Sequence, residues 1–301
     1  MSIEVQNITK LYGKQKALDQ VSFTVKTGQI VGFIGPNGAG KTTAIRIITG
    51  SIPPTSGTVQ VENLDVSEHA LQVKKLIGYL PEDNPLYDDL YIREYLNYVA
   101  GIYKIKNKKS RVDEVIKLTG LTKEIKKQIG ALSKGYRQRV GLAQAIIHDP
   151  EVLILDEPTS GLDPNQIVEI RNLISRLGKK KTVILTTHIM QEVEAICDRV
   201  IIINNGKIVA DDKASELSLS DKDIFTVIVE FDKKVNASDL KSIEDVIKTV
   251  KIEGNKYLVE SKSGSDIRPK LFQYAVKNNM TVLSMNLKAK SLQQVFQELT
   301  R

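Results

Sequence analysis

The sequence has a single cysteine, Cys197, and no apolar run long enough to cross a bilayer. One cysteine excludes an internal disulfide and fits a reducing compartment. Apolar runs such as Val152–Leu155 and Val200–Ile203 suit buried strands and fall far short of the roughly 20 residues of a membrane-spanning helix. The first residues also lack a basic region followed by an apolar stretch, so we expect no signal peptide.

The overall composition is that of a globular protein with room for two domains. The chain has 301 residues, of which 41% are hydrophobic and 26% charged. Its formal net charge of +7 is compatible with binding to nucleic acid or to an acidic membrane surface. The lysines are scattered along the chain, however, and a solvated surface explains their short clusters equally well.

The hydrophobic pattern of the first two thirds of the chain predicts an α/β fold. The first thirty residues show the alternation of half-buried strands, which suggests an antiparallel β-subdomain. Ile30–Ile34 is a continuous apolar run, as in a central strand, and residues from about 88 to 148 have helical spacing. From residue 151 on, strands and helices alternate, which favours a parallel sheet with helices packed on it.

A polar stretch at 211–223 marks the expected domain boundary, so we predict one domain over 1–215 and another over 223–301. Beyond this stretch the pattern reads strand, helix, strand, strand, helix and strand, the order of an α+β ferredoxin-like sandwich. A last helix is expected over Leu292–Leu299, with Ser291 as its N-cap.

The most specific motif is a glycine-rich loop between the strand Ile30–Ile34 and a helix. It fits G-x-x-x-x-G-K-[ST], a P-loop, whose main-chain N–H groups cradle phosphates at a helix N-terminus. Lys41 would reach the β- and γ-phosphates of ATP, and the Thr42 hydroxyl would be a ligand of Mg²⁺. The predicted nucleotide-binding residues here are Gly35, Pro36, Asn37, Gly38, Ala39, Gly40, Lys41, Thr42 and Thr43.

Two adjacent acids follow the apolar strand Val152–Leu155. In phosphoryl-transfer sites one acid at such a position holds Mg²⁺, and another group positions or deprotonates the attacking water. We assign Asp156 to the metal, through a water molecule, and Glu157 to the water nucleophile. Together with the P-loop, this pair predicts a Mg²⁺-dependent ATPase.

Several further motifs resemble the nucleotide-binding subunits of ABC transporters. Residues 132–139, Leu-Ser-Lys-Gly-Tyr-Arg-Gln-Arg, resemble the signature sequence of that family, and residues 160–163, Ser-Gly-Leu-Asp, its D-loop. His188, after two threonines, is similar to the switch histidine, and Tyr12 lies where the family stacks an aromatic ring on adenine. The resemblance covers residues 1 to about 210 and implies a P-loop NTPase core with a helical signature subdomain.

Within this family the chain most resembles ATPases of the drug- and polysaccharide-export branch. Residues 291–299 and Lys134-Gly135-Tyr136 are similar to gliding-motility-associated ATPases. The resemblance implies integral membrane permease subunits as partners and a peripheral position on the cytoplasmic face of the inner membrane. Nucleic acid is not an expected partner.

The resemblance also implies a mechanism in which two ATPase subunits, two copies of this chain in a homodimer, face head to tail around two ATP molecules. Ser133 and Gly135 would contact the γ-phosphate bound by the other subunit, and Asp163 of the D-loop belongs to the same expected nucleotide-contacting set. His188 would contact the γ-phosphate and hold the attacking water.

Two departures from the family pattern affect this expectation. Glu82 stands where the family has a glutamine, and an ionised carboxylate accepts hydrogen bonds but does not donate them. Glu82 could still meet Mg²⁺ or its water. Lys134 and Tyr136 replace the usual glycine and glutamine of the signature. We expect activity to be retained because the residues Ser133, Gly135, Glu157 and His188 are all present.

Other classes of protein share these motifs. A DNA-maintenance ATPase would insert long coiled coils between P-loop and signature, whereas only 91 residues separate Lys41 from Ser133. A translation-type ABC protein acting on the ribosome would carry two ATPase domains, and this chain has one P-loop. The C-terminal domain could be a dimer-contact or docking domain, which we favour, or a module that senses a small ligand.

Overall fold

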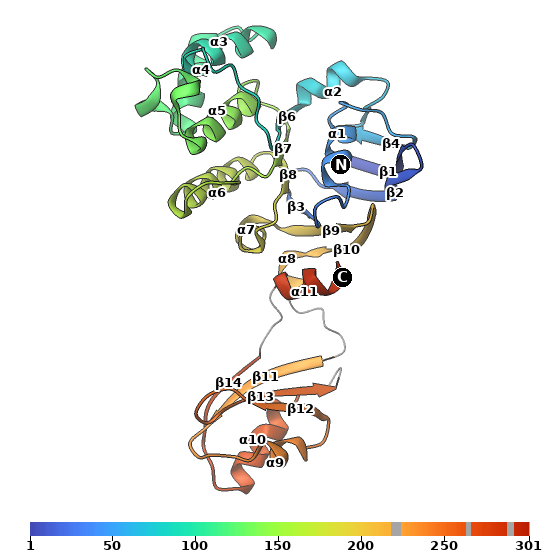
Figure 1. Ribbon diagram of the computed structural model, residues 1–301, viewed down its shortest axis with the longest axis vertical. Helices are drawn as coiled ribbons and strands as arrows, with labels where there is room; N and C mark the ends of the chain where they lie inside the picture. Colours follow the sequence, from blue (N-terminus) through green and yellow to red (C-terminus); the bar gives the residue numbers. More distant parts are fainter. Residues whose placement is uncertain (218–223, 263–265, 288–291, 301) are drawn as a thin grey trace. The chain divides into compact units, whose positions relative to one another are not determined.

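The computed structural model describes residues 1–217, 224–262, 266–287 and 292–300. The chain divides into two compact units (Figure 1). The first contains Met1–Ala214 and the last residues of the chain from Phe296 on, and the second contains Ser215–Val295. None of the helices in the described ranges combines the length and the apolar character that a membrane span requires.

A six-stranded sheet forms the centre of the first unit. In sheet order its strands are β10 (Lys207–Lys213), β9 (Arg199–Asn204), β3 (Ile30–Ile34), β8 (Thr182–Thr186), β7 (Val152–Asp156) and β6 (Ile77–Leu80). Only β10 pairs antiparallel; the remaining neighbours are parallel. Strands β3, β7 and β8 are buried along their whole length, as expected of strands covered on both faces. Their carboxyl ends therefore meet at one edge of the sheet.

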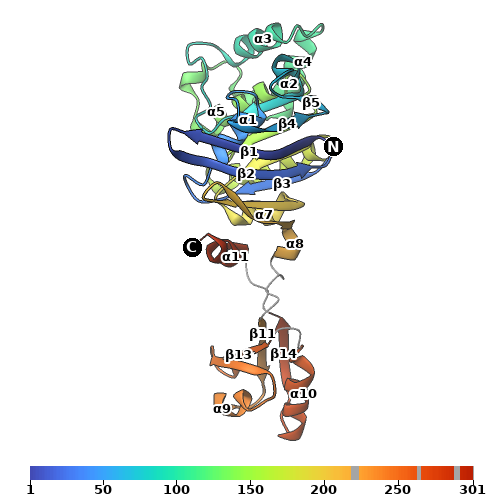
Figure 2. The same cartoon turned by 90° about the vertical axis from the view of Figure 1, so that its right-hand side faces the viewer.

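The predicted N-terminal β-subdomain is confirmed as a second, antiparallel sheet (Figure 2). Its strands, in sheet order, are β2 (Gln15–Val25), β1 (Ile3–Tyr12), β4 (Ser56–Val61) and β5 (Leu64–Asp65). Helix α1 (Lys41–Ile48) buries its apolar side chains in a cluster that also contains residues of β1, β4 and β9. The two sheets and α1 thus share one core, and α1 is fixed between them.

Helices complete the first unit. Helix α2 (Ala70–Leu76) leads into β6, and the expected helical subdomain consists of α3 (Ile92–Ile102), α4 (Lys108–Leu118) and α5 (Lys134–Ile146), grouped together in Figure 1. Two short 3-10 turns, Thr122–Glu124 and Ile129–Ala131, connect α4 to α5. Helices α6 (Pro164–Gly178) and α7 (Met190–Ile196) link the parallel strands, and α8 (Ala214–Leu217) follows β10.

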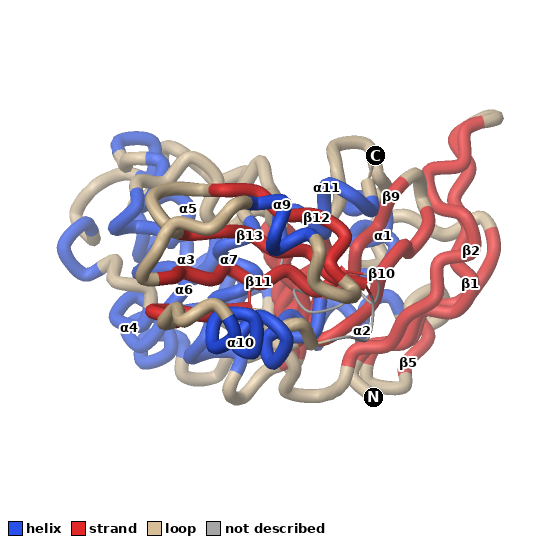
Figure 3. Tube along the Cα trace, turned by 90° about the horizontal axis from the view of Figure 1, so that it is seen from below, coloured by secondary structure: helices blue, strands red, loops and turns tan. Residues whose placement is uncertain are grey.

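The second unit has the predicted ferredoxin-like order. It consists of β11 (Ile224–Phe231), α9 (Ala237–Lys241), β12 (Val246–Lys251), β13 (Lys256–Lys262), α10 (Arg268–Lys277) and β14 (Val282–Leu287). The strands form an antiparallel sheet in the order β12-β13-β11-β14. Helices α9 and α10 lie on one side of it (Figure 3), and their apolar residues share a core with one face of β11 and β13.

The end of the chain departs from the prediction. We assigned residues 223–301 to one C-terminal domain, whereas the residues from Phe296 on group with the first unit. Helix α11 (Leu292–Leu299) has the predicted bounds, and the Asn204 side chain at the end of β9 donates a hydrogen bond to the carbonyl of Leu299 at 3.5 Å. This contact joins the last helix to the first unit. The predicted N-cap, Ser291, lies outside the described residues.

Candidate nucleotide site

The glycine-rich loop connects β3 to α1 at the edge where the parallel strands end. Gly38 and Gly40 have left-handed backbones, with φ of 78° and 109°, which favours glycine at both positions. A Cβ on Gly40 would also lie 2.6 Å from the carbonyl oxygen of Ala17, so a side chain does not fit there. A turn of this kind directs N–H groups toward an anion, and α1 adds the positive end of its dipole.

Lys41, the first residue of α1, folds back over the loop. Its ammonium group donates to the carbonyl oxygens of Gly35 at 2.7 Å and Pro36 at 3.1 Å. Burial lowers the pKa of Lys41, and nearby carboxylates, Glu157 foremost, act in the opposite direction. A positive charge is therefore fixed on the loop, within the electrostatic reach of the acidic side of the site.

Asp156 and Glu157 are held by the neighbouring strand. The hydroxyl of Thr186, at the end of β8, donates to Oδ1 of Asp156 and accepts the main-chain N–H of Glu157 at 3.0 Å. Glu157 adopts a φ of 50°, a strained value for a residue with a side chain. Burial raises the pKa of both carboxyl groups, and their hydrogen bonds oppose that rise. One buried hydroxyl thus sets the positions of both acids.

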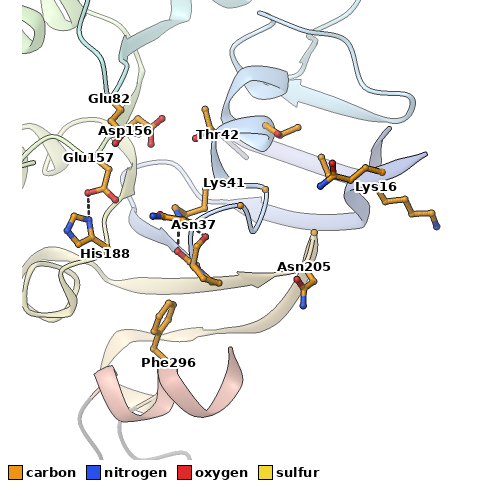
Figure 4. A pocket seen from close by; sticks show the side chains of 18 residues that line it. Lys16, Asn37, Lys41, Thr42, Glu82, Asp156, Glu157, His188, Asn205 and Phe296 are labelled. Carbon is orange, nitrogen blue, oxygen red and sulfur yellow. Dashed lines mark hydrogen bonds and ion pairs between the residues drawn. The ribbon is translucent and has the colours of Figure 1, made fainter. Parts of the chain in front are cut away.

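His188 follows β8 and contacts the second acid. Its Nδ1 lies 2.9 Å from Oε2 of Glu157 (Figure 4). The histidine side chain is 65% exposed, whereas that of Glu157 is only 9% exposed. The imidazole therefore stands between a buried carboxylate and the open side of the site.

These side chains line a single cavity of about 770 Å³ (Figure 4). This volume lies within the range of small-ligand sites, about 300–1,000 Å³. The lining residues are Gln15, Lys16, Ala17, Gly35, Pro36, Asn37, Gly38, Gly40, Lys41, Thr42, Thr43, Glu82, Asp156, Glu157, His188, Asn205, Gly206 and Phe296. The cavity thus brings together the P-loop, both acids, the histidine and Glu82 from distant parts of the sequence.

Some residues predicted for the site lie outside the cavity lining: Tyr12, Ala39, Ser133, Gly135 and Asp163. Ala39 is buried within the loop. Tyr12 ends β1 and is 50% exposed, with the ammonium of Lys10 5.5 Å from its ring centroid. The predicted adenine-stacking ring therefore faces solvent at the end of its strand.

The signature and D-loop residues meet at a second place. Ser133 is the N-cap of α5 and Asp163 the N-cap of α6, where its carboxylate accepts the N–H of Gln166 at 2.9 Å. A Cβ on Gly135 would lie 2.4 Å from Oε1 of Gln166. The starts of α5 and α6 therefore contact each other closely. The absence of a side chain at Gly135 leaves room for the side-chain amide of Gln166.

The two substituted signature positions have partners within the chain. A Cβ on Gly161 would lie 2.4 Å from Nζ of Lys134, so the lysine side chain covers the D-loop. The guanidinium carbon of Arg139 lies 5.7 Å from the ring centroid of Tyr136. Lys134 thus bridges the signature to the D-loop.

Part of the lining was not predicted. Gln15, Lys16 and Ala17 come from β2, and Asn205 and Gly206 form the β9–β10 turn. A hairpin turn was expected at Asn205-Gly206, but the hydrogen bond from the Gly206 N–H to the Ala39 carbonyl at 3.0 Å depends on the tertiary fold. Phe296 lies far along the chain and carries no local signal for a nucleotide site.

The oxygen donors of the cavity suit Mg²⁺ bound together with a phosphate. The hydroxyl of Thr42 and the carboxylates of Asp156 and Glu82 all line it. Within the described ranges no group of three or more His, Cys, Asp or Glu side chains could hold a metal ion. Mg²⁺ is usually bound through one or two carboxylates plus substrate phosphates, so the residues present fit this mode of binding.

A parallel sheet whose glycine-rich loop and acid pair lie at the carboxyl ends of neighbouring strands defines a P-loop nucleotide-binding protein. Residues 18–160 match the family model of the ABC transporters. The chain is 37% identical to the bacitracin transport ATP-binding protein BcrA of Bacillus licheniformis, over 99% of this chain and 96% of that protein. It is 38% identical to the linearmycin resistance ATP-binding protein LnrL of Bacillus subtilis, over 69% and 68%. The chain belongs to the ATP-binding proteins of the ABC transporter family.

Solved structures agree with this assignment. An ATP-binding subunit of an ABC transporter matches with a TM-score of 0.67 and 28% identity, over 73% of this chain and 92% of that one. An ATP-binding cassette solved as a dimer in a post-hydrolysis state with ADP and Pi matches with a TM-score of 0.65 and 26% identity, over 70% and 98%.

Proposed function

We propose that the chain is the ATP-hydrolysing subunit of an ABC exporter and acts on separate membrane subunits. The observation that carries this proposal is one cavity in which Lys41 on the P-loop faces the hydrogen-bonded pair Glu157–His188. The relatives named for bacitracin transport and linearmycin resistance support export. The narrower link to gliding motility stays a prediction from the sequence.

In the proposed reaction the P-loop N–H groups and Lys41 hold the triphosphate of ATP. Glu157 accepts a proton from a water molecule, whose oxygen attacks the γ-phosphorus while the bond to the oxygen of ADP breaks. His188 orients the carboxylate through its contact of 2.9 Å and faces the γ-phosphate. Burial raises the pKa of Glu157, which makes it a better proton acceptor than an exposed glutamate.

A bound Mg²⁺ would offset negative charge on the β- and γ-phosphate oxygens. We propose that the Thr42 hydroxyl and Asp156, the latter through water, hold this ion, with Glu82 beside it. Asp156 is kept in place by the Thr186 hydroxyl, so its carboxylate needs no rearrangement when nucleotide enters.

The position of the signature residues supports a head-to-tail dimer. Ser133, Gly135 and Asp163 lie outside the cavity of their own chain. A second copy, facing the first head to tail, would bring the N-terminus of its α5 to the γ-phosphate, where main-chain N–H groups and the helix dipole favour an anion. The dimeric cassette found among the solved structures is consistent with such an assembly.

The membrane partner is proposed to be an integral permease, with this chain on the cytoplasmic face of the inner membrane. The alternative, a non-transport ABC ATPase acting on DNA or the ribosome, is less favoured because the 91 residues between Lys41 and Ser133 form the strands β4, β5 and β6 and short helices such as α3 and α4. We propose a docking or dimer-contact role for the second unit and expect no nucleic-acid partner.

The test is the substitution Glu157→Gln in the full chain. The amide keeps the size of the side chain but cannot accept a proton, so kcat for ATP hydrolysis should fall by about 100-fold or more, while the Kd for ATP stays within about twofold. Glu151→Gln is the matched control, since Glu151 is an exposed acid at the opposite end of the same strand. Unchanged turnover in Glu157→Gln would rule out the proposed base.

A further inference from the structure

Helices α9 and α10 cover one face of the four-stranded sheet in the second unit (Figure 3). The core on that face takes alternate residues of the two central strands, such as Val227 of β11 and Val259 of β13. The residues between them point to the opposite face, because successive side chains of a strand alternate. This opposite face is called the open face below.

An apolar row crosses the middle of the open face. Val250 of β12 is paired with Leu258 of β13, which in turn is paired with Ile228 of β11. Leu258 and Ile228 are half-buried among their neighbours, and Val250 is 42% exposed. A sheet face that meets only water carries polar side chains as a rule. Three aligned apolar side chains therefore indicate that another surface covers this row.

Charged side chains flank the row on both sides. On one side Lys248 and Glu260 are cross-strand neighbours, with 3.9 Å between Nζ and Oε1. On the other side Lys256 and Glu230 are neighbours, with 3.6 Å between Nζ and Oε2. Both lysines are well exposed, so these pairs stabilise a single chain only weakly. The four charges cancel, which does not suit an acidic membrane surface or nucleic acid.

The order of these charges is self-complementary. Glu260 and Lys256 both belong to β13 and lie two residues to either side of Leu258. If a second copy is laid on the open face with a two-fold axis along the row, the row meets itself, and Glu260 of each copy faces Lys256 of the other. A two-fold axis along the strands would instead place Val250 opposite Asn286 of β14.

We propose that the open face is a contact between two copies of this chain, packed sheet on sheet about the apolar row. This proposal deepens, and rests on, the dimer-contact role proposed above for the second unit. The contact uses no residue of the nucleotide cavity. It therefore keeps two copies together while their ATP sites are empty.

The first experiment measures the Kd of the full-length dimer by sedimentation without nucleotide. Glu260→Lys places lysine opposite lysine at both charged contacts, and Lys256→Glu places glutamate opposite glutamate. Each variant alone should therefore have a Kd raised by at least about tenfold. An equal mixture of the two should dimerise with nearly the parental Kd, because both contacts of a mixed dimer join a lysine to a glutamate.

Rescue by mixing cannot come from repair within one chain, since each chain keeps its own substitution. The matched controls are Glu244→Lys and Lys270→Glu, because these residues form an ion pair of 2.9 Å that involves α10, on the other side of the sheet. They should leave the Kd of the dimer unchanged, alone and mixed. Thermal unfolding of each variant checks that it is folded.

The second experiment uses Leu258→Cys, in which each new thiol lies near the two-fold axis and meets its own copy. A mild oxidant should join two such chains by a disulfide. Phe272→Cys is the control, since Phe272 is 58% exposed on α10, and it should not form covalent dimers at the same concentration. Cys197 is buried, so the parent chain gives the background.

The outcomes separate this contact from the proposed hydrolysis of ATP. A parent chain that stays monomeric would overturn the contact and leave a segment of the permease as the occupant of the open face. Absence of rescue in the mixture, or equal cross-linking of Leu258→Cys and Phe272→Cys, would also overturn it. Parental turnover in Glu157→Gln together with rescue by mixing would reject the proposed hydrolysis alone.

Discussion

Thr186 shows how one residue can organise the reactive groups of the site. It is fully buried, and its hydroxyl serves Asp156 and Glu157 at once, as donor to the first and acceptor from the second. Two residues later comes His188, which contacts Glu157 from the other side. The end of β8 therefore fixes the acid pair at the end of β7.

This arrangement makes Thr186→Val a sharp test. Valine has nearly the same shape but leaves a buried oxygen of Asp156 without its hydroxyl donor, which should cost about 1–3 kcal/mol of unfolding free energy. We also expect kcat to fall by about tenfold, because the N–H of Glu157, a residue with a strained backbone, keeps only the main-chain carbonyl at position 186 as its acceptor. Unfolding curves and steady-state ATP hydrolysis measure the two effects.

Thr182→Val in the same strand is the matched control. Thr182 is also buried, and its hydroxyl accepts the N–H of Gly28 at 3.1 Å, away from the cavity. The variant Thr182→Val should therefore have a lower free energy of unfolding than the parent chain but the same kcat. Equal kcat values for Thr186→Val and Thr182→Val would contradict the organising role of Thr186.

The residues that could be predicted from the sequence are those carried by local patterns. The P-loop lies between an apolar strand and a helix, and Asp156 and Glu157 follow a buried strand, so neighbours in sequence reveal them. Thr186 was noted only beside His188, because its two hydrogen bonds cross between strands. Phe296 was seen only as a helix residue, since its place in the cavity depends on the tertiary fold.

At the scale of elements, the main departure from prediction concerns the last helix. Periodicity gave its bounds, and the ferredoxin-like order of the second unit followed from the alternation of strands and helices. The hydrophobic periodicity of a helix does not show, however, which of the two units the helix packs against. That depends on long-range contacts such as the one from Asn204 to Leu299.

A chain truncated after Leu217 tests whether the first unit folds without the second. It keeps both sheets of the first unit and their shared core, so we expect a folded protein with one cooperative thermal transition. Differential scanning calorimetry provides the measurement.

Failure of the truncated chain to fold would contradict this expectation, because it would show that the first unit is not independent of the second.

At the scale of the whole molecule, the separation of the signature from the cavity predicts complementation between two inactive chains. Lys41→Ala disables the P-loop but keeps the signature, and Ser133→Arg does the reverse at an exposed helix cap. In a head-to-tail dimer of the two variants, one site would combine both intact halves. An equal mixture should therefore recover about a quarter of parental ATPase activity, since about half of the dimers are mixed.

Each variant alone provides the control, because neither forms an intact site with itself. Activity should rise and fall as the mixing ratio passes through equality. A flat response at every ratio would exclude shared sites between two copies of this chain.

The attachment of α11 beside the P-loop has a practical consequence for work with the protein. An affinity tag fused after the last residue begins directly beyond a helix whose phenylalanine lines the ATP cavity. Its bulk and charge would act next to the binding site and distort measured affinities. Met1 is 63% exposed and is not among the residues that line the cavity, so purification handles belong at that end.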